Sequence, residues 1–180
     1  MGMDRLRGFV AAVDALNRML GEALSWLTLG TVLVCFAVVV LRYGFGIGFV
    51  WMQELYVWQH ALVFMLGAGY TLLHNGHVRV DVFYGRAGGR RRAWIDITGT
   101  LVFLLPWLAV LAWESAPFIG QSWTIREASQ QTGGLPGYFL LKSAVWAFCL
   151  LLGLQGVALI ARRALYLAGD ARYTPHAGTD

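Results

Sequence analysis

The sequence predicts an all-α integral membrane protein with four transmembrane helices, an N-terminal amphipathic helix and both termini in the cytoplasm. Three observations lead to this prediction: four long apolar stretches, a low content of charged residues, and an uneven distribution of basic residues among the connecting segments. Of the 180 residues, 58% are hydrophobic and 13% are charged, whereas soluble domains contain about 25% charged residues. We therefore expect a single membrane domain over residues 1–180.

The four apolar stretches have the length of transmembrane helices. They cover approximately residues 24–41, 50–73, 94–113 and 138–160, and about 20 residues cross roughly 30 Å of hydrocarbon. The first stretch is longer than the apolar core of a cleavable signal peptide, which has about 7 to 15 residues, so we expect it to be retained. Pro106 should kink the third helix.

Residues 1–23 are predicted to form a cytoplasmic amphipathic helix, because apolar residues recur there at helical spacing with charged residues between them. The apolar set is Leu6, Phe9, Val10, Val13, Leu16 and Leu20, and the charged set is Arg5, Asp14, Arg18 and Glu22. Two placements stay open: the helix lies on the membrane surface, or it extends the first span inward. Residues 161–180 are predicted to form a cytoplasmic tail.

Basic residues lie mostly on one side of the predicted membrane domain. The segment before the first span, the second loop and the segment after the fourth span contain three, five and three of them, whereas the first and third loops contain one each. By the positive-inside rule, both termini and the second loop are cytoplasmic. The net charge of +4 therefore reports orientation, and we expect no nucleic-acid partner.

Two charged residues near the outer ends of predicted helices need partners. Glu54 and Lys142 each lie four residues inside their helices, roughly 6 Å below the boundary at about 1.5 Å per residue, where charged groups are costly. We predict that Glu54 pairs with Lys142 or with Arg42, just after the first span. Such a pair would hold helices together; the alternative is a proton-coupling or ion-coupling role.

Asp96 poses the same question at the inner end of the third span. We predict that it meets Arg79 or one of the arginines at 90–92. Again a structural role is preferred over ion coupling, which intramembrane carboxylates also perform.

Polar and small residues recur every seven positions on two spans, which places each set on one helix face. The sets are Gln53, His60, Gly67 and His74 on the second span, and Lys142, Cys149 and Gly156 on the fourth. We predict that these two stripes face each other, because small residues permit close helix approach.

Enzyme chemistry finds little support in the sequence. Neither a signature of nucleophile, base and orienting acid nor a nucleotide-binding loop is present. Haem between facing histidines of a helical bundle is an alternative, but only His60 lies near the middle of a span, so one subunit lacks the second ligand. We expect no catalytic residue, no metal and no cofactor. Another alternative is a self-assembling channel or transporter lined by Glu54 and His60.

Several short motifs occur in a fairly specific order and spacing. They are Arg42, the run Trp51-Met52-Gln53-Glu54-Leu55, the run Phe64-Met65-Leu66-Gly67-Ala68, the run His77-Val78-Arg79-Val80-Asp81, Glu127-Ala128-Ser129, Gly134-Leu135-Pro136 and Lys142. In this arrangement the chain resembles the small, Q-type membrane subunit of tripartite ATP-independent periplasmic (TRAP) transporters over nearly all four spans. Gln53 stands where the family often has a second acidic residue, which weakens any role that needs paired carboxylates.

The resemblance implies a scaffold role in the bacterial inner membrane. In such systems a periplasmic binding protein captures an organic acid, commonly a C4-dicarboxylate, and delivers it to a large multispanning subunit. That subunit carries the substrate and sodium sites and moves substrate by an elevator-like mechanism driven by a sodium gradient. The small subunit braces it and binds no substrate. The structural or interface candidates are then Arg42, Trp51, Gln53, Glu54, His60, His77, Arg79, Asp81, Asp96, Glu127 and Lys142.

The predicted outer loop, residues 114–137, has two interpretations. It contains Phe118, Trp123, Arg126 and Glu127, which suit a docking surface for the binding protein. The simpler interpretation is a solvated connector between the third and fourth spans.

Overall fold

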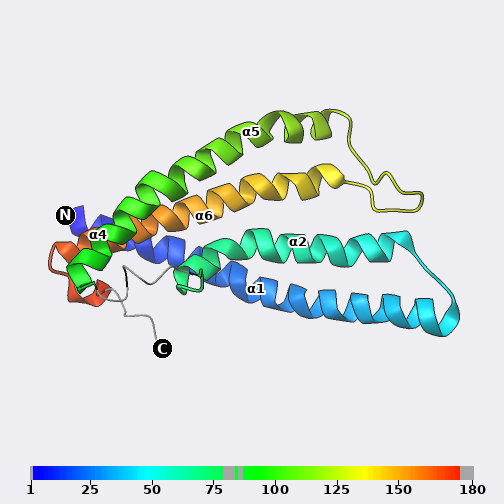
Figure 1. Cartoon of the computed structure of the whole chain (residues 1–180), viewed down its shortest axis with the longest axis horizontal. Helices are drawn as coiled ribbons and strands as arrows, with labels where there is room; N and C mark the ends of the chain where they lie inside the picture. The colour runs from blue at the N-terminus through cyan, green and yellow to red at the C-terminus, as the bar shows by residue number, and fades with distance from the viewer. Residues whose placement is uncertain (1, 79–83, 85–86, 175–180) are drawn as a thin grey trace.

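The computed structural model describes residues 2–78, 84 and 87–174, and the regular secondary structure in these ranges is helical. Two long antiparallel hairpins make up the molecule (Figure 1). The helices are α1 (Gly2–Phe45), α2 (Val50–Leu73), α4 (Gly89–Gly99), the π-helical turn η1 (Thr100–Leu104), α5 (Leu105–Thr124), α6 (Tyr138–Leu167) and the 3-10 helix η2 (Ala171–Tyr173).

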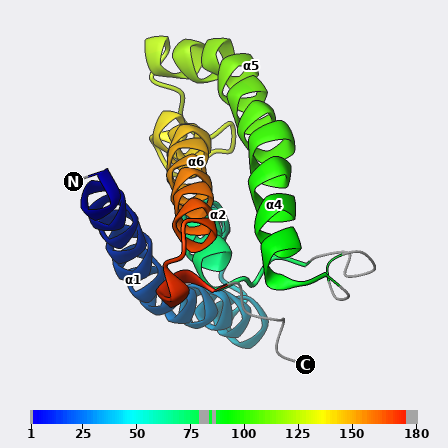
Figure 2. The ribbon, with the colours of Figure 1, turned by 90° about the vertical axis from the view of Figure 1, so that its left-hand side faces the viewer.

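Helix α6 is the centre of the structure. It packs against α1, α2, α4, η1 and α5, and its buried apolar residues include Leu151, Leu159 and Leu165. Viewed end-on, α6 lies between α1 and α5 (Figure 2). Within the described ranges, α5 has no substantial contact with α1 or α2, so the arrangement is open rather than a closed four-helix bundle. The outward faces of α1 and η1 therefore expose apolar side chains such as Phe36 and Phe103.

The open placement of the N-terminal segment is resolved, because α1 runs without interruption from Gly2 to Phe45. Residues 1–23, as far as they are described, thus form one helix with the predicted first span; that this part of the helix points into the cytoplasm stays a prediction. Their apolar face is packed in part, since Val10 and Val13 are buried whereas Phe9 and Leu16 are exposed. The first span was predicted to end at residue 41, whereas α1 continues for about one more turn, to Phe45. Arg42 ends the apolar run but not the helix.

Two predicted spans agree closely with the helices. Helix α2 covers the predicted residues 50–73, and α6 begins at Tyr138 as predicted. The prediction that a tail begins at residue 161 is wrong, since α6 continues to Leu167 with Arg163 and Leu165 buried. The helix continues past its charged residues, because Arg162 and Arg163 have ion-pair partners in neighbouring elements.

The third helix is longer than predicted at both ends. Continuous helix runs from Gly89 to Thr124, so the loop predicted from residue 114 begins only after Thr124. The error arose because hydropathy falls at Glu114 although the backbone stays helical through Pro117. The disturbance expected at Pro106 takes the form of η1, a π-helical turn just before the first turn of α5. Such turns re-route backbone hydrogen bonds that proline cannot make.

Three helices among the described residues are long and apolar enough to cross a membrane: α1, the composite of α4, η1 and α5, and α6. Helix α2 has 24 residues, enough for a span at about 1.5 Å per residue, but Gln53, Glu54, Gln59 and His60 make it less apolar. A fourth span therefore stays a prediction that rests on its length and its packing along α1 and α6.

Candidate functional site

A buried carboxylate organises the end of the molecule that the basic-residue pattern predicts to face outward, called the outer end below. Glu54 on α2 is 8% exposed and accepts hydrogen bonds from the Ser129 hydroxyl, from the Leu135 backbone N–H at 2.6 Å and from the Tyr138 hydroxyl at 3.4 Å. Hydrogen bonds to a charged group contribute about 1.5–3 kcal/mol each. We call the segment 125–137, as held by Glu54, the outer cap.

The outer cap is folded back on itself at Gly134. The Ser129 N–H donates to the Leu135 carbonyl at 3.1 Å, which brings both Glu54 donors together. A Cβ on Gly134 would lie 2.2 Å from Ser129 Oγ and 2.8 Å from Glu54 Oε1. Only glycine leaves room for the carboxylate here, so the Gly134-Leu135-Pro136 motif has a direct physical reason. The cap is therefore an ordered connector, although most of its residues are exposed to solvent, and whether it also docks the binding protein stays a prediction.

An ion pair fixes the other side of the cap. Helix α5 ends in a Schellman motif, in which the Glu127 N–H donates to the Ser122 carbonyl at 3.0 Å and Arg126 has φ 50°. This turn directs the chain back toward α6. There the Lys142 ammonium lies 2.5 Å from Glu127 Oε2 and 3.9 Å from the Phe118 ring centroid. The hydrogen bond from Lys142 holds the pKa of the Glu127 carboxyl below its ordinary value of 4.5.

The predicted pairing of Glu54 with Lys142 or Arg42 is wrong. Lys142 pairs with Glu127, Arg42 is exposed, and Glu54 is satisfied by uncharged donors of the outer cap. Equal depth in the membrane was a correct reason to expect a partner for each charge. It did not identify that partner, because the loop folds down between the helix ends and supplies Glu127 and Ser129.

Glu54→Gln is expected to loosen the outer cap. The amide keeps one acceptor oxygen, so either the Leu135 N–H or the Ser129 hydroxyl loses its bond, at a cost of about 1–3 kcal/mol. Cleavage by trypsin after Arg126 should therefore become about 5- to 100-fold faster, because opening of the cap exposes that bond. Gln53→Ala is the matched control. Gln53 is the neighbour of Glu54 in sequence, and its side chain makes no hydrogen bond within the described residues. Equal cleavage rates for the two variants would contradict this role of Glu54.

The outer cap is also expected to loosen at low pH. Because the pKa of Glu127 is lowered in the folded state, its pair with Lys142 contributes fully above the ordinary value of 4.5. The contribution is lost as the pH falls through the lowered folded-state value. Hydrogen-exchange protection of residues 125–137, corrected for intrinsic rates, should thus fall in acid for the unmodified chain. Glu127→Gln should show low protection of this segment already at neutral pH and a weaker pH dependence.

A second polar cluster, the inner network, lies between α1 and α6. Asn17 Nδ2 donates to Gln155 Oε1 at 2.9 Å, and Gln155 Nε2 donates to Asp14 Oδ1 at 3.1 Å. The same Asp14 oxygen accepts from Arg162 at 2.7 Å. Asn17 and Gln155 are at most 1% exposed, so this chain of hydrogen bonds is part of the core. A Cβ on Gly69 of α2 would lie 2.1 Å from Asn17 Oδ1, so the network also requires a glycine on α2.

Asp96 forms a buried ion pair with α6. Its Oδ2 accepts from Arg163 Nε at 2.7 Å, and the two side chains are 7% and 5% exposed; the Tyr84 hydroxyl also donates to Asp96. The prediction of a partner in the second loop or at residues 90–92 missed this arginine, which we had assigned to the tail. Arg79, the other predicted partner, lies outside the described residues. Consecutive arginines thus join α6 to two elements: Arg162 to α1 and Arg163 to α4.

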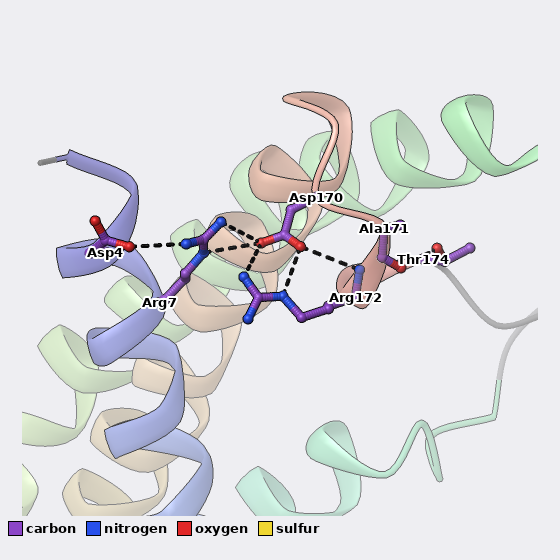
Figure 3. A network of polar contacts seen from close by, with 6 residues as sticks. All are labelled: Asp4, Arg7, Asp170, Ala171, Arg172 and Thr174. Carbon is purple, nitrogen blue, oxygen red and sulfur yellow. Dashed lines mark hydrogen bonds and ion pairs between the residues drawn. The ribbon is translucent and has the colours of Figure 1, made fainter.

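A third cluster ties the two ends of the chain together (Figure 3). Arg7 of α1 and Arg172 of η2 both contact the Asp170 carboxylate at 3.0 Å, and Arg7 also contacts Asp4 at 2.9 Å. Hydrogen bonds from Arg172 and then Arg7 lower the pKa of Asp170. Both ends of the described chain therefore lie at the same end of the helices, opposite the outer cap (Figure 1).

The prediction that the stripe on the second span faces the stripe on the fourth span, each built from residues seven positions apart, is wrong. Gly156 of α6 faces η1, since a Cβ there would lie 3.1 Å from Leu104 and 3.2 Å from Thr100, and Cys149 lines a groove with α5. Gly67 faces Leu24 of α1. A stripe of small residues shows which face packs closely but does not identify the neighbour.

The remaining candidates are spread over the molecule. Arg42 and Trp51 are exposed, Gln53 is half-buried, and His77 is exposed at the inner end of α2. Asp81, like Arg79, lies outside the described residues. His60 is exposed beside α1, whereas Glu54 is buried under the outer cap. Within this chain the two therefore do not line one path, which argues against the channel alternative.

The residues that sequence reasoning missed are the uncharged polar ones. Asn17 lies four residues after Val13 and seven before Leu24, on the buried face of α1, and Gln155 lies inside the fourth apolar stretch. A polar residue on an apolar face was the available signal. Within the described ranges, no group of three or more histidine, cysteine or acidic side chains is placed to hold a metal ion.

Comparison with protein families decides the identity of this membrane domain. Residues 31–166 match the family described as tripartite ATP-independent periplasmic transporters, DctQ component. The match extends from the last third of α1 to the end of α6 and includes the whole outer cap. The chain belongs to the DctQ family. Searches of curated proteins and of solved structures gave no match.

Membership confirms the resemblance drawn from the short motifs. It identifies this chain as the small membrane subunit of a TRAP transporter. In such systems the DctQ component works with a large membrane subunit and a substrate-binding protein. Several motifs of this DctQ component now have a structural meaning, because Glu54, Glu127, Ser129, Gly134 and Lys142 all meet at the outer cap.

Proposed function

We propose that this DctQ component braces the large transport subunit in the bacterial inner membrane and binds no substrate itself. The observation that carries the proposal is how its buried polar groups are used. Glu54 holds the outer cap, Asn17 and Gln155 join α1 to α6, and Asp96 pairs with Arg163. These groups stabilise one arrangement of helices and do not converge on an open cavity.

The grooves between the helices also suit a scaffold. A groove of about 820 Å³ between α1, α2, η1, α5 and α6 is lined largely by apolar residues, among them Leu24, Phe64, Trp107 and Phe148. Recognition of a carboxylate substrate requires fixed hydrogen-bond donors or cations. The described lining of this groove offers no arginine or lysine, and its Ser25, Thr28 and Thr71 hydroxyls donate to backbone carbonyls of their own helices. Both facts support placing the substrate site in the large subunit.

The transport system is proposed to take up an organic acid, such as a C4-dicarboxylate, in symport with sodium. A periplasmic binding protein delivers the acid, and the large subunit moves it by an elevator-like mechanism. In this proposal α2 also crosses the membrane, which makes four spans in total, and both termini are cytoplasmic. Support comes from the basic residues of the inner end and from the contact between Arg7 and Asp170. Docking of the binding protein on the outer cap stays a prediction.

The test is reconstitution. A tagged form of the chain is purified gently from its native membrane, and the large subunit is expected to co-purify in stoichiometric amount. The pair is then placed in proteoliposomes with the binding protein, a labelled organic acid and an inward sodium gradient. Uptake should require all three proteins, and the DctQ component alone should give none. Uptake by the large subunit without the DctQ component, or by the DctQ component alone, would contradict the scaffold role.

A further inference from the structure

The two outward faces of the molecule differ in polarity at the depth of the membrane centre. The face of α5 and η1 exposes only apolar side chains between residues 101 and 113: Leu101, Val102, Phe103, Pro106, Trp107, Ala109, Val110 and Trp113. Such a face is suited to lipid chains. The face formed by α1 and α2 is different, because it exposes His60.

His60 lies in a groove of about 520 Å³ between α1 and α2, which we call the His60 groove. Its lining is Thr31, Val32, Cys35, Phe36, Val39, Tyr56, Val57 and His60. His60 is ten residues from the start of α2, about 15 Å at 1.5 Å per residue. That distance is half of the roughly 30 Å of hydrocarbon, so the histidine is at the membrane centre.

The polar side chains of this groove differ in whether the described chain gives them a hydrogen-bond partner. The Thr31 hydroxyl donates to the Leu27 carbonyl at 2.9 Å. Within the part of the chain that the structure describes, the His60 ring and the Tyr56 hydroxyl make no hydrogen bond. A polar side chain that faces lipid at this depth is costly, and such side chains usually face other protein. Lipid chains offer it no hydrogen-bond partner.

We infer that the His60 groove is the surface on which a transmembrane helix of the large subunit docks, with a hydrogen-bonding side chain opposite His60. This inference rests on the proposed function, which supplies the partner. The apolar lining from Val32, Phe36, Val39 and Val57 provides van der Waals contact, the main driving force for helix association in lipid. His60 sets the depth at which the two helices align.

A cysteine already present in the groove makes the test direct. Cys35 is exposed, so Cys149→Ser leaves one cysteine there for a maleimide-linked photocrosslinker. The control chain carries Cys35→Ser, Cys149→Ser and Phe103→Cys, which moves the probe to the exposed face of η1. In membranes that contain the large subunit, the probe at Cys35 should crosslink to that subunit in high yield and the probe at position 103 should not.

Other crosslinking patterns would overturn the inference. In one such pattern, only the probe at position 103 crosslinks to the large subunit. In another, the probe at Cys35 crosslinks to a second copy of this chain. In a third, the probes at both positions label lipid and no protein. Co-purification of the unmodified chain with the large subunit, done first, separates the two proposals. If the large subunit is absent there, the proposed function fails; if it is present but the crosslinks are reversed, only the His60 groove is wrong.

A substitution gives an independent measurement. His60→Ala should weaken binding of the large subunit by about 3- to 30-fold, the equivalent of one interhelical hydrogen bond in a membrane. His60→Gln, which keeps a donor and an acceptor, should retain more of the affinity. Because His60 has no partner within the described chain, neither change should alter the stability of the isolated DctQ component. Unchanged affinity for His60→Ala would overturn the inference.

Discussion

Gly69→Ala should lower the free energy of unfolding of the DctQ component in detergent by about 2–5 kcal/mol. A Cβ at this position would lie 2.1 Å from Asn17 Oδ1 and 3.3 Å from the Leu151 carbonyl. The methyl group therefore forces α2 away from both α1 and α6, and it disturbs the bond between Asn17 and Gln155. Unfolding by increasing mole fraction of a denaturing detergent, followed by circular dichroism, measures the loss.

The matched control is Gly67→Ala, two residues away on the same helix. Its Cβ would lie 3.8 Å from Leu24, an ordinary van der Waals distance, and alanine has a higher helix propensity than glycine. This variant should be as stable as the unmodified chain or slightly more stable. If both substitutions cost the same, the effect of Gly69 comes from helix propensity or general packing, and the Asn17 contact has no special importance.

Arg163→Met should be destabilising by about 3–5 kcal/mol, because it removes the Arg163 guanidinium from the buried Asp96 carboxylate. The side chains of this pair are 5% and 7% exposed. Asp96→Asn should cost a similar amount, since it leaves the arginine buried without its counter-charge. The double variant should recover much of the loss, because neither charge then remains. The same detergent titration provides the measurement, and the deviation from additivity gives the coupling of the pair.

Arg162→Met tests whether burial is the reason. The pair of Arg162 with Asp14 has side chains that are 17% and 22% exposed, so water compensates part of the loss. Its cost should be clearly smaller than that of Arg163→Met, although the two arginines are neighbours in sequence. Equal costs for the two would mean that removal of any arginine from this end of α6 weakens the structure, independent of its partner.

Much of the helical framework could be predicted because it depends on local properties. An apolar run of about 20 residues must satisfy its backbone hydrogen bonds internally in lipid, and a helix does so. This reason is independent of neighbours, and α2 and the start of α6 were predicted correctly. Helix ends were less certain, since α5 continues beyond the apolar run to Thr124. The backbone only needs its hydrogen bonds, and it can keep them after hydropathy falls.

The need for partners was also predictable, but their identity was not. Glu54 and Lys142 were expected to require compensation because of their depth, and both have it. The compensation comes from residues 127, 129 and 135 of a loop. The composition of a loop does not indicate how deep in the membrane it lies, so nothing in the sequence placed this loop between the helix ends. The turn at Arg126 and the space at Gly134 decide that placement.

The sequence by itself determined that this chain is helical, that it belongs in a membrane and that its short motifs match the DctQ family, because these properties are written in local hydropathy and residue order. Only the tertiary structure decided which helix each polar residue meets. Arg162 and Arg163 are adjacent in sequence, yet a step of about 100° around the helix sends one to Asp14 and the other to Asp96. Helical periodicity gives the angle between two side chains, and the packing of the helices gives what lies at each angle.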